Sequence, residues 1–339
     1  MDSKERIDLV VAGKIPDKIP YCIELTKKGK ENFARDYEIP VESIERFIDN
    51  DLLYVNFSHP ENFTPEKLQN GKIRDEFGVT WDMEKASNIG DWGMVDHPVK
   101  DLSLEGYNFP SAAGKGRFNE TGKIVRKNPG KFNLLQMVGI FEIPTRFAGM
   151  ENIMVAIGSD EDFAFKCFDM ALEFNLGILG QIPDYIHGVR FIEDWGDQRG
   201  LMMGVEYWRK YLKPRLRIMY EECRNKGCAV SIHSCGNITE LIPELIEIGV
   251  DIIDPIQPEV MDLHFIKKEY GKDVVLFGGI GTQSTLPLCT PEQVIEEAKN
   301  LLSFMSVGGN FIMGPSGAVT VDTPSENIAA LIEFCRSVR

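Results

Sequence analysis

The stretch CAVSIHSCGNITELIPELIEIGVDIIDPIQP, residues 228–258, decides the fold of this chain. It opens with an apolar run at 228–233, continues with helical spacing at 238–248, and returns to an apolar run at 250–254. Two strands separated by a single helix imply parallel pairing through a right-handed crossover. Runs that are apolar at almost every position are typical of strands buried on both faces.

The same alternation continues through the rest of the second half. Two further helices begin at Thr290-Pro291 and Thr323-Pro324, where threonine is the N-cap and proline takes the first helical position. The remaining strands and helices of this half are expected at 186–195, 204–226, 261–270, 274–277 and 311–313.

Three more apolar runs in the first half, at 21–25, 53–57 and 132–138, bring the count close to eight strands. That count favours an α/β protein of the (β/α)₈ TIM barrel type, with residues 1–339 forming a single domain. An open doubly wound sheet is the weaker alternative, because no G-x-G-x-x-G follows a strand.

Residues from about 60 to 130 interrupt the alternation. This region is rich in Gly, Asn and Asp, and the pieces at 71–74 and 78–81 alternate polar and apolar residues. We expect a β-hairpin-rich insertion on the barrel rim. It either covers a site, as loops on rigid scaffolds often do, or is a decorative loop.

Composition excludes several classes of partner. The formal net charge is −15 and there is no basic run, so nucleic acid is not an expected partner. No apolar run approaches the roughly 20 residues that a membrane span requires. The N-terminus has no apolar segment of a signal peptide, and seven scattered cysteines do not form a disulfide pattern. A cytoplasmic protein is therefore expected.

His233 and Cys235 give the sharpest chemical signal. Alternate positions of an extended segment point to the same side, so the imidazole and the thiol converge at the end of an expected strand. Nitrogen and sulfur ligands suit Zn²⁺, and Gly236 allows a sharp turn after them. The pattern H-x-C alone is equally compatible with core packing or a polar loop.

Other polar residues follow the remaining expected strands. Asp194 is a candidate acid, base or substrate ligand, although it equally fits a residue that orients a neighbour. Gln257 lies between two prolines, which stiffen its backbone and aim its amide. We assign these two residues to catalysis. The candidate substrate-binding residues are Trp195, Gln198, Gln283 and Ser316.

These motifs together resemble a known family from about residue 130 to the C-terminus. The matching segments are EDWGDQ at 193–198, IHSCGN at 232–237, DPIQP at 254–258, FGGI at 277–280 and TPSEN at 323–327. The chain is similar to the uroporphyrinogen decarboxylase-like group, which includes corrinoid-dependent methyltransferases. Before residue 130 only DKIP at 17–20 resembles the approach to that family's first strand.

The resemblance implies methyl transfer between a small methylated compound, such as an O-methyl ether, and a corrinoid carried by a partner protein. His233 and Cys235 match the zinc-binding H-x-C of the methyltransferase branch. The Arg-rich segment of the true decarboxylases is missing, since ELTKKG stands at 24–29. Two alternatives stay open: a metal-independent lyase acting on a small carboxylic acid, and a non-catalytic binding protein.

One position departs from the methyltransferase pattern. The third zinc ligand, usually a cysteine after strand eight, aligns with Gly317, beside Ser316. Neither residue is a good zinc ligand. We therefore expect water, substrate, or an oxygen of Asp254 or Gln257 to complete the site.

Overall fold

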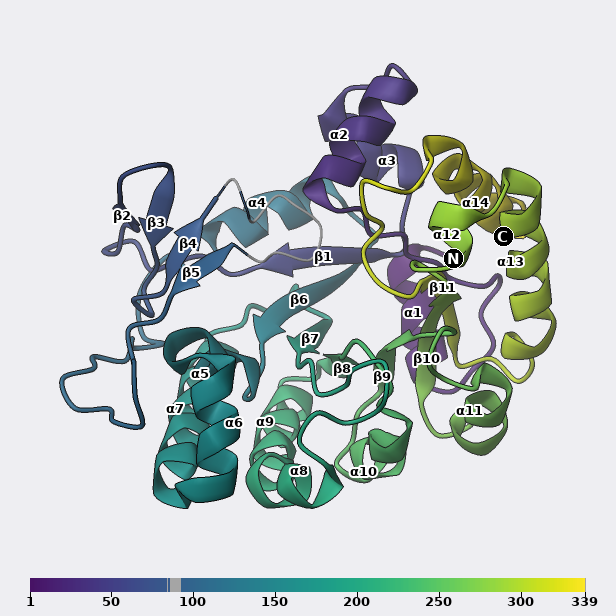
Figure 1. The fold of residues 1–339 in the computed structure, drawn as a ribbon. Helices are drawn as coiled ribbons and strands as arrows, with labels where there is room; N and C mark the ends of the chain where they lie inside the picture. Colours follow the sequence, from purple (N-terminus) through teal and green to yellow (C-terminus); the bar gives the residue numbers. More distant parts are fainter. Residues whose placement is uncertain (84, 86–92, 339) are drawn as a thin grey trace.

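Strands of the second half join two strands of the first half in one parallel, curved sheet (Figure 1). The computed structural model describes residues 1–83, 85 and 93–338. The seven strands of this sheet, in spatial order, are β1 (Leu52–Asn56), β6 (Phe132–Val138), β7 (Gly188–Ile192), β8 (Ala229–His233), β9 (Ile252–Ile256), β10 (Val275–Ile280) and β11 (Phe311–Pro315). Every strand-to-strand pairing in it is parallel.

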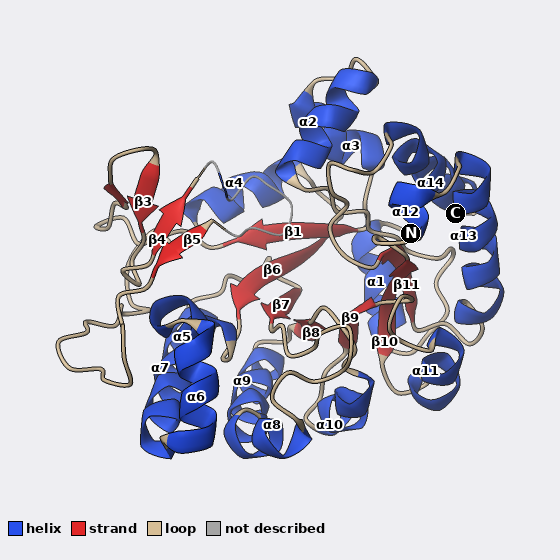
Figure 2. Cartoon of the chain, in the orientation of Figure 1, coloured by secondary structure: helices blue, strands red, loops and turns tan. Residues whose placement is uncertain are grey.

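The strands are buried because both faces of the sheet are covered. Every residue of β9, β10 and β11 is buried, as the near-continuous apolar runs of the sequence predicted. Helices surround the outside of the sheet (Figure 2). The expected TIM-barrel class is confirmed.

The expected first strand differs from the prediction. Residues 21–25 pair with the sheet only at two parallel bridges, Tyr21 with Met313 and Leu25 with Val319. On the other side, the Tyr21 amide donates to Asp51 Oδ2 at 3.0 Å, and Ile23 exchanges two hydrogen bonds with the Asn50 amide. The side chains of Asn50 and Asp51 thus form the hydrogen bonds that a neighbouring strand would otherwise form with this backbone. The extended segment therefore connects β11 to the residues before β1.

The helices follow the predicted order with one break. The expected helix at 204–226 divides at Leu212, and Pro214 lies in the first turn of its second part. The helices are α1 (Ser3–Val11), α2 (Lys27–Asp36), η1 (Val41–Ser43), α3 (Ile44–Ile48), α4 (Asn119–Lys127), α5 (Glu142–Ala148), α6 (Met150–Ser159), α7 (Glu161–Leu179), α8 (Val205–Tyr211), α9 (Lys213–Asn225), η3 (Thr239–Leu241), α10 (Ile242–Glu247), α11 (Leu263–Tyr270), α12 (Thr285–Leu288), α13 (Pro291–Met305) and α14 (Ser325–Ser337). Among the described residues, none of these helices has the length and apolar character to cross a bilayer.

The insertion in the N-terminal half is confirmed as a small antiparallel sheet. Its strands, in spatial order, are β2 (Glu66–Lys67), β3 (Lys72–Arg74), β4 (Thr80–Asp82) and β5 (Met94–Asp96). Part of the insertion, residues 84 and 86–92, lies outside the described residues. Arg117, which is fully buried, donates to Glu76 and so fixes the β3–β4 turn to the approach of α4.

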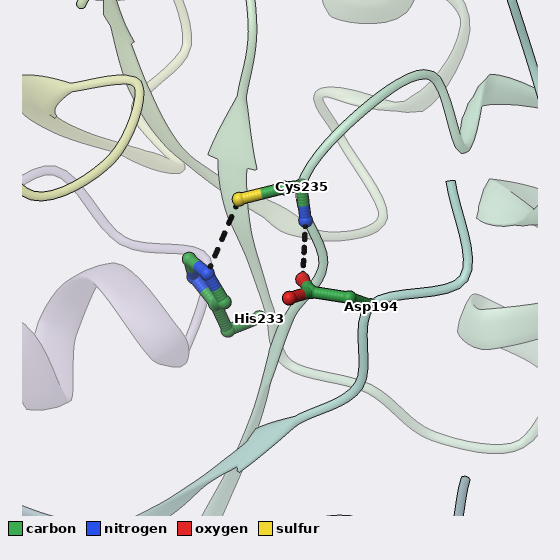
Figure 3. A group of neighbouring side chains, drawn as sticks. All are labelled: Asp194, His233 and Cys235. Atoms are coloured by element: carbon green, nitrogen blue, oxygen red, sulfur yellow. Dashed lines mark hydrogen bonds between the residues drawn. The ribbon is translucent and has the colours of Figure 1, made fainter. Parts of the chain in front are cut away.

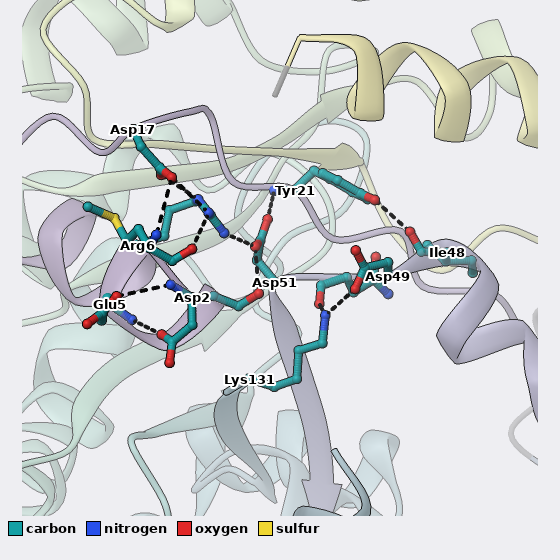
Figure 4. A network of polar contacts seen from close by, with 12 residues as sticks. Asp2, Glu5, Arg6, Asp17, Tyr21, Ile48, Asp49, Asp51 and Lys131 are labelled. Carbon is teal, nitrogen blue, oxygen red and sulfur yellow. Dashed lines mark hydrogen bonds and ion pairs between the residues drawn. The ribbon is translucent and has the colours of Figure 1, made fainter. Parts of the chain in front are cut away.

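A buried ion pair anchors the N-terminal helix at the start of the sheet (Figure 4). Arg6 Nη1 donates to Asp51 Oδ1 at 2.6 Å, and its Nε donates to Asp17 at 2.8 Å. Asp51 precedes β1 and accepts from Tyr21 as well, so one carboxylate connects α1, the extended segment and β1. The capping box of Asp2 and Glu5 begins α1.

Candidate active site

Three potential metal ligands meet where β7 and β8 end (Figure 3). The ligand atoms of Asp194, His233 and Cys235 all lie within 4.8 Å of one another. Ile192 pairs with His233 in the sheet register, so Asp194, two residues further on, lies beside the H-x-C segment. The predicted convergence of the His233 and Cys235 side chains is present, and Asp194 is the third member of the group.

The turn after β8 holds the thiol in place. The Cys235 amide donates to Asp194 Oδ1 at 2.9 Å, and the Gly236 amide donates to Gln257 Oε1 at 3.0 Å. Gly236 has φ of +80°, and a Cβ added to it would lie 2.5 Å from the backbone carbon of Gly196. Only glycine fits this close approach of the two loops.

The three donors fit a zinc ion. The distance from Cys235 Sγ to His233 Nε2 is 3.6 Å. Two ligands bonded to one tetrahedral zinc at its usual bond lengths stand about 3.6 Å apart. Three protein donors also leave a position open, as catalytic zinc sites do. The structure places the carboxylate of Asp194 beside the two predicted donors, where we expected water, substrate, or an oxygen of Asp254 or Gln257.

Behind His233 lies a buried cation that the sequence analysis missed. Arg190 of β7 donates to Asp254, to Gln136 Oε1 at 2.7 Å and to His233 Nδ1 at 2.7 Å. Burial alone would raise the pKa of Asp254, but the charges of Arg190 and His233 outweigh it and hold that pKa below its usual range. A lone arginine inside an apolar strand was the available signal, because arginine is almost never buried without partners.

These contacts set the proton position on the imidazole. While Nδ1 of His233 accepts from Arg190, the ring proton of the neutral form lies on Nε2, which faces the Cys235 thiol. A metal ligated through Nε2 requires that proton to leave. Asp254 Oδ2 lies 3.5 Å from the same Nδ1. A proton on Nδ1, the arrangement usual behind metal-binding histidines, would therefore have Asp254 as its acceptor only after Arg190 ceased to donate to that nitrogen.

Two of the residues predicted to act directly occupy supporting positions. Trp195 is fully buried and packs edge-to-face on Trp208, so it is not exposed to a substrate, as a substrate-binding residue would be. Gln257 is also buried, and its amide oxygen is bonded to the turn that carries Cys235. Its contacts are those of a residue that positions the thiol.

The other predicted substrate-binding residues form a separate group at the ends of β10 and β11. Gln198 donates to Gln283 at 3.2 Å, while Ser316 contacts Thr282 and Glu259. A Cβ added to Gly317 would have Thr282 Oγ1, at 3.8 Å, as its one neighbour within 4 Å among the described residues.

A cavity of about 410 Å³ opens on the same face of the barrel, and Asp194, His233 and Cys235 are not among its lining residues. It lies over the carboxyl ends of β1 and β6, between the β3–β4 turn and α5. Gln136 lines it and, through Arg190, connects it to His233. Its lining residues are Asn56, Phe57, Ser58, His59, Asp75, Glu76, Phe77, Gln136, Val138, Ile143 and Arg146.

Two carboxyl groups lie close to Asp194, the buried Glu193 and the half-buried Glu142. Both oxygens of Glu193 accept backbone amides, from Ile140 at 2.6 Å and Phe141 at 2.9 Å, and burial raises its pKa to about 8. Burial also raises the pKa of Glu142 to about 7, and its neighbours are Arg146 and Asp194. Glu142 was not predicted, because nothing in the sequence distinguishes it from a surface carboxylate.

A curved α/β barrel with nitrogen, oxygen and sulfur donors at adjacent strand ends, on the same face as a cavity, defines a TIM-barrel protein with an enzyme-type site. The model of the family Uroporphyrinogen decarboxylase (URO-D) matches residues 123–338, and the chain belongs to this family.

The similar proteins are methyltransferases. The methylated-thiol–coenzyme M methyltransferase of Methanosarcina mazei is 22% identical over 275 residues, 78% of this chain and 71% of that protein. The methylcobamide:CoM methyltransferase MtbA of Methanosarcina acetivorans is 21% identical over 253 residues, 73% of this chain and 71% of that protein. A solved methyltransferase from Methanosarcina mazei shares the fold, with a TM-score of 0.76 at 17% identity over 99% of both chains. The predicted resemblance to the methyltransferase branch is confirmed.

Proposed function

We propose that this protein is an enzyme that moves a methyl group between a small methylated compound, such as an O-methyl ether, and the cobalt of a separate corrinoid protein, with assistance from zinc. The observation that carries the proposal is the meeting of Asp194, His233 and Cys235 at two adjacent strand ends. The names of the similar proteins supply the reaction class, since they specify methyl transfer and, for MtbA, a methylcobamide.

Asp194, His233 and Cys235 would hold the zinc, and Arg190 and Asp254 would orient the imidazole. Zinc at this position would polarise the oxygen of a methyl donor or keep a thiol acceptor in its thiolate form. The corrinoid of the partner supplies the carbon chemistry, and this chain positions the methyl group.

The cavity over the ends of β1 and β6 is the proposed binding site of the methylated compound. It has the size usual for small-molecule sites, roughly 300–1,000 Å³, and its wall includes Gln136, which is hydrogen-bonded to the residue behind His233. Gln198, Gln283 and Ser316 lie at other strand ends of the same barrel face. We propose that they contact the larger partner.

Absorbance spectroscopy of the corrinoid tests the proposal. The chain, a corrinoid protein with its cobalt reduced, and a panel of methylated donors are mixed, and the corrinoid spectrum is followed. We expect a donor-dependent change with wild type and His264→Ala, and none with His233→Ala. His264 is a suitable control because it stacks on Phe304 outside the site. Methyl transfer to a simple acceptor without corrinoid would contradict the proposal.

A further inference from the structure

The cavity contains one cation, Arg146, whose guanidinium forms no hydrogen bond with the described residues. The Arg146 side chain is 22% exposed, and its one ion pair among the described residues is with Glu142, whose oxygen lies 3.9 Å from Nε. That distance is too long for a hydrogen bond. Within the described part of the chain, the guanidinium otherwise lies over the Trp81 ring at 5.8 Å. A largely buried charge is costly unless a partner satisfies it.

The acidic groups of the cavity, in contrast, are already bonded. Glu76 accepts from Arg117 and contacts His59 at 3.0 Å. Asp75 accepts from the Trp81 indole at 2.7 Å and from two backbone amides. As far as the described residues show, the unmet hydrogen-bonding capacity of this cavity is therefore that of a cation, which a ligand with an anionic group would satisfy.

Another part of the wall is aromatic and held in place. Phe57 and Phe77 both line the cavity, and both rings pack against Phe174, with centroids 6.5 Å and 5.0 Å away. Val138 and Ile143 complete this apolar surface. Such a wall favours a flat, apolar ligand body, because aromatic rings pair well with one another.

We propose that the methyl donor is a small aromatic carboxylate whose carboxylate group binds Arg146 and whose ring lies against Phe57 and Phe77. This inference rests on the proposed function, because only that function makes the bound compound a methyl donor. A planar guanidinium matches a carboxylate through two parallel hydrogen bonds. Asp75 and Glu142 nearby favour a singly charged group over a doubly charged phosphate, since like charges at short range repel.

Binding to the full chain without corrinoid tests the inference. The probes are 4-methoxybenzoate and its neutral counterpart 4-methoxybenzamide, measured by titration calorimetry. We expect the acid to bind about 10- to 100-fold more tightly, since hydrogen bonds to charged groups are worth that difference. Arg146→Gln should abolish the preference, Arg146→Lys should keep part of it, and the exposed control Arg126→Gln should keep all of it.

Equal affinity for acid and amide, or a preference that survives Arg146→Gln, would overturn the inference. Tighter binding of 4-methoxybenzenesulfonate than of the carboxylate would overturn the carboxylate assignment. Both Arg146 variants should melt no lower than wild type, because the guanidinium makes no hydrogen bond with the described residues. Should Arg146→Gln not fold, Arg146→Lys decides.

The experiments can reject the proposed function and the carboxylate-binding inference independently of each other. Carboxylate binding through Arg146 with no methyl transfer to any corrinoid would reject the proposed function and leave the inference intact. Methyl transfer from neutral donors by a fully active Arg146→Gln would reject the inference alone.

Discussion

Cys235 is the residue on which the proposed zinc site depends most, because it supplies the thiolate of the three donors. We expect Cys235→Ser to weaken zinc binding by more than the about 10- to 100-fold that loss of an outer-shell partner costs. Competition with a chelator measures this affinity. Cys289→Ser, outside the site, is the matched control and should bind zinc as wild type does. Unchanged affinity in Cys235→Ser would remove this residue from the metal site.

The sequence predicted the donors on β8 better than their surroundings. His233 and Cys235 were predictable because side-chain direction alternates along a strand, which is a local property. Asp194 was noted, but its place beside them depends on the register of β7 against β8. Arg190 was not predicted, because a sequence does not say which side chains of a buried strand point to the barrel interior.

Replacement of Asn50 tests how strongly its side chain stabilises the extended segment at 21–25. Its amide exchanges two hydrogen bonds with Ile23, at 2.7 Å and 3.0 Å. Asn50→Ala leaves a buried amide and carbonyl without these partners, so we expect a loss of about 2 kcal/mol in the free energy of unfolding. Denaturant titration measures it, with exposed Asn62→Ala as control. No loss would mean that the two bonds do not stabilise this segment.

Disruption of the ion pair between Glu76 and Arg117 tests how the insertion is attached to the segment before α4. Glu76→Gln leaves the fully buried Arg117 without its carboxylate, which should cost about 3 kcal/mol of unfolding free energy at neutral pH. Burial would raise the pKa of Glu76, but His59 and Arg117 outweigh it and lower that pKa below its ordinary 4.5. The stabilisation is therefore complete above pH 4.5 and disappears as the pH falls through the lower, folded-state value.

Denaturation of wild type and Glu76→Gln across this pH range measures the effect. The difference between the two proteins should shrink below pH 4.5, while Glu120→Gln, whose carboxylate pairs on the surface with Lys123, should match wild type throughout. A difference that grows in acid would contradict the stated role of Glu76.

Elements with regular periodicity were predictable, and the irregular one was not. The segments at 132–138 and 228–233 became β6 and β8 within a residue of their predicted bounds. The segment at 21–25 has the same apolar composition, yet two polar side chains, Asn50 and Asp51, bond its backbone where a strand would pair. Whether side chains take the place of a pairing strand depends on tertiary contacts, and no local sequence pattern reveals those contacts.

At the scale of the whole molecule, the chain has the barrel fold, and one prediction concerns the segment where the resemblance places the Arg-rich clamp of the true decarboxylases. Residues 24–29 read ELTKKG, and they lead into α2. We expect no decarboxylation of uroporphyrinogen, because the Arg-rich clamp of the true decarboxylases is missing. Detection of coproporphyrinogen in a direct assay would restore the lyase alternative.

The cavity could not be predicted from the sequence, because segments distant in the chain form it. Its wall combines the ends of β1 and β6, the β3–β4 turn of the insertion and α5, segments up to 90 residues apart between Asn56 and Arg146. The sequence predicted an insertion on the rim and left open whether it covers a site. Asp75, Glu76 and Phe77 of the insertion line the cavity.

The central claim is that the donors Asp194, His233 and Cys235 assist methyl transfer to a corrinoid. The most direct measurement is the transfer of a deuterated methyl group from a donor to a reduced corrinoid protein, followed by mass spectrometry while zinc is returned to chelator-treated protein. We predict that the rate rises in proportion to bound zinc and stays at background in Cys235→Ser. Full transfer by zinc-free protein, or no transfer at full zinc occupancy with any donor, would contradict the account.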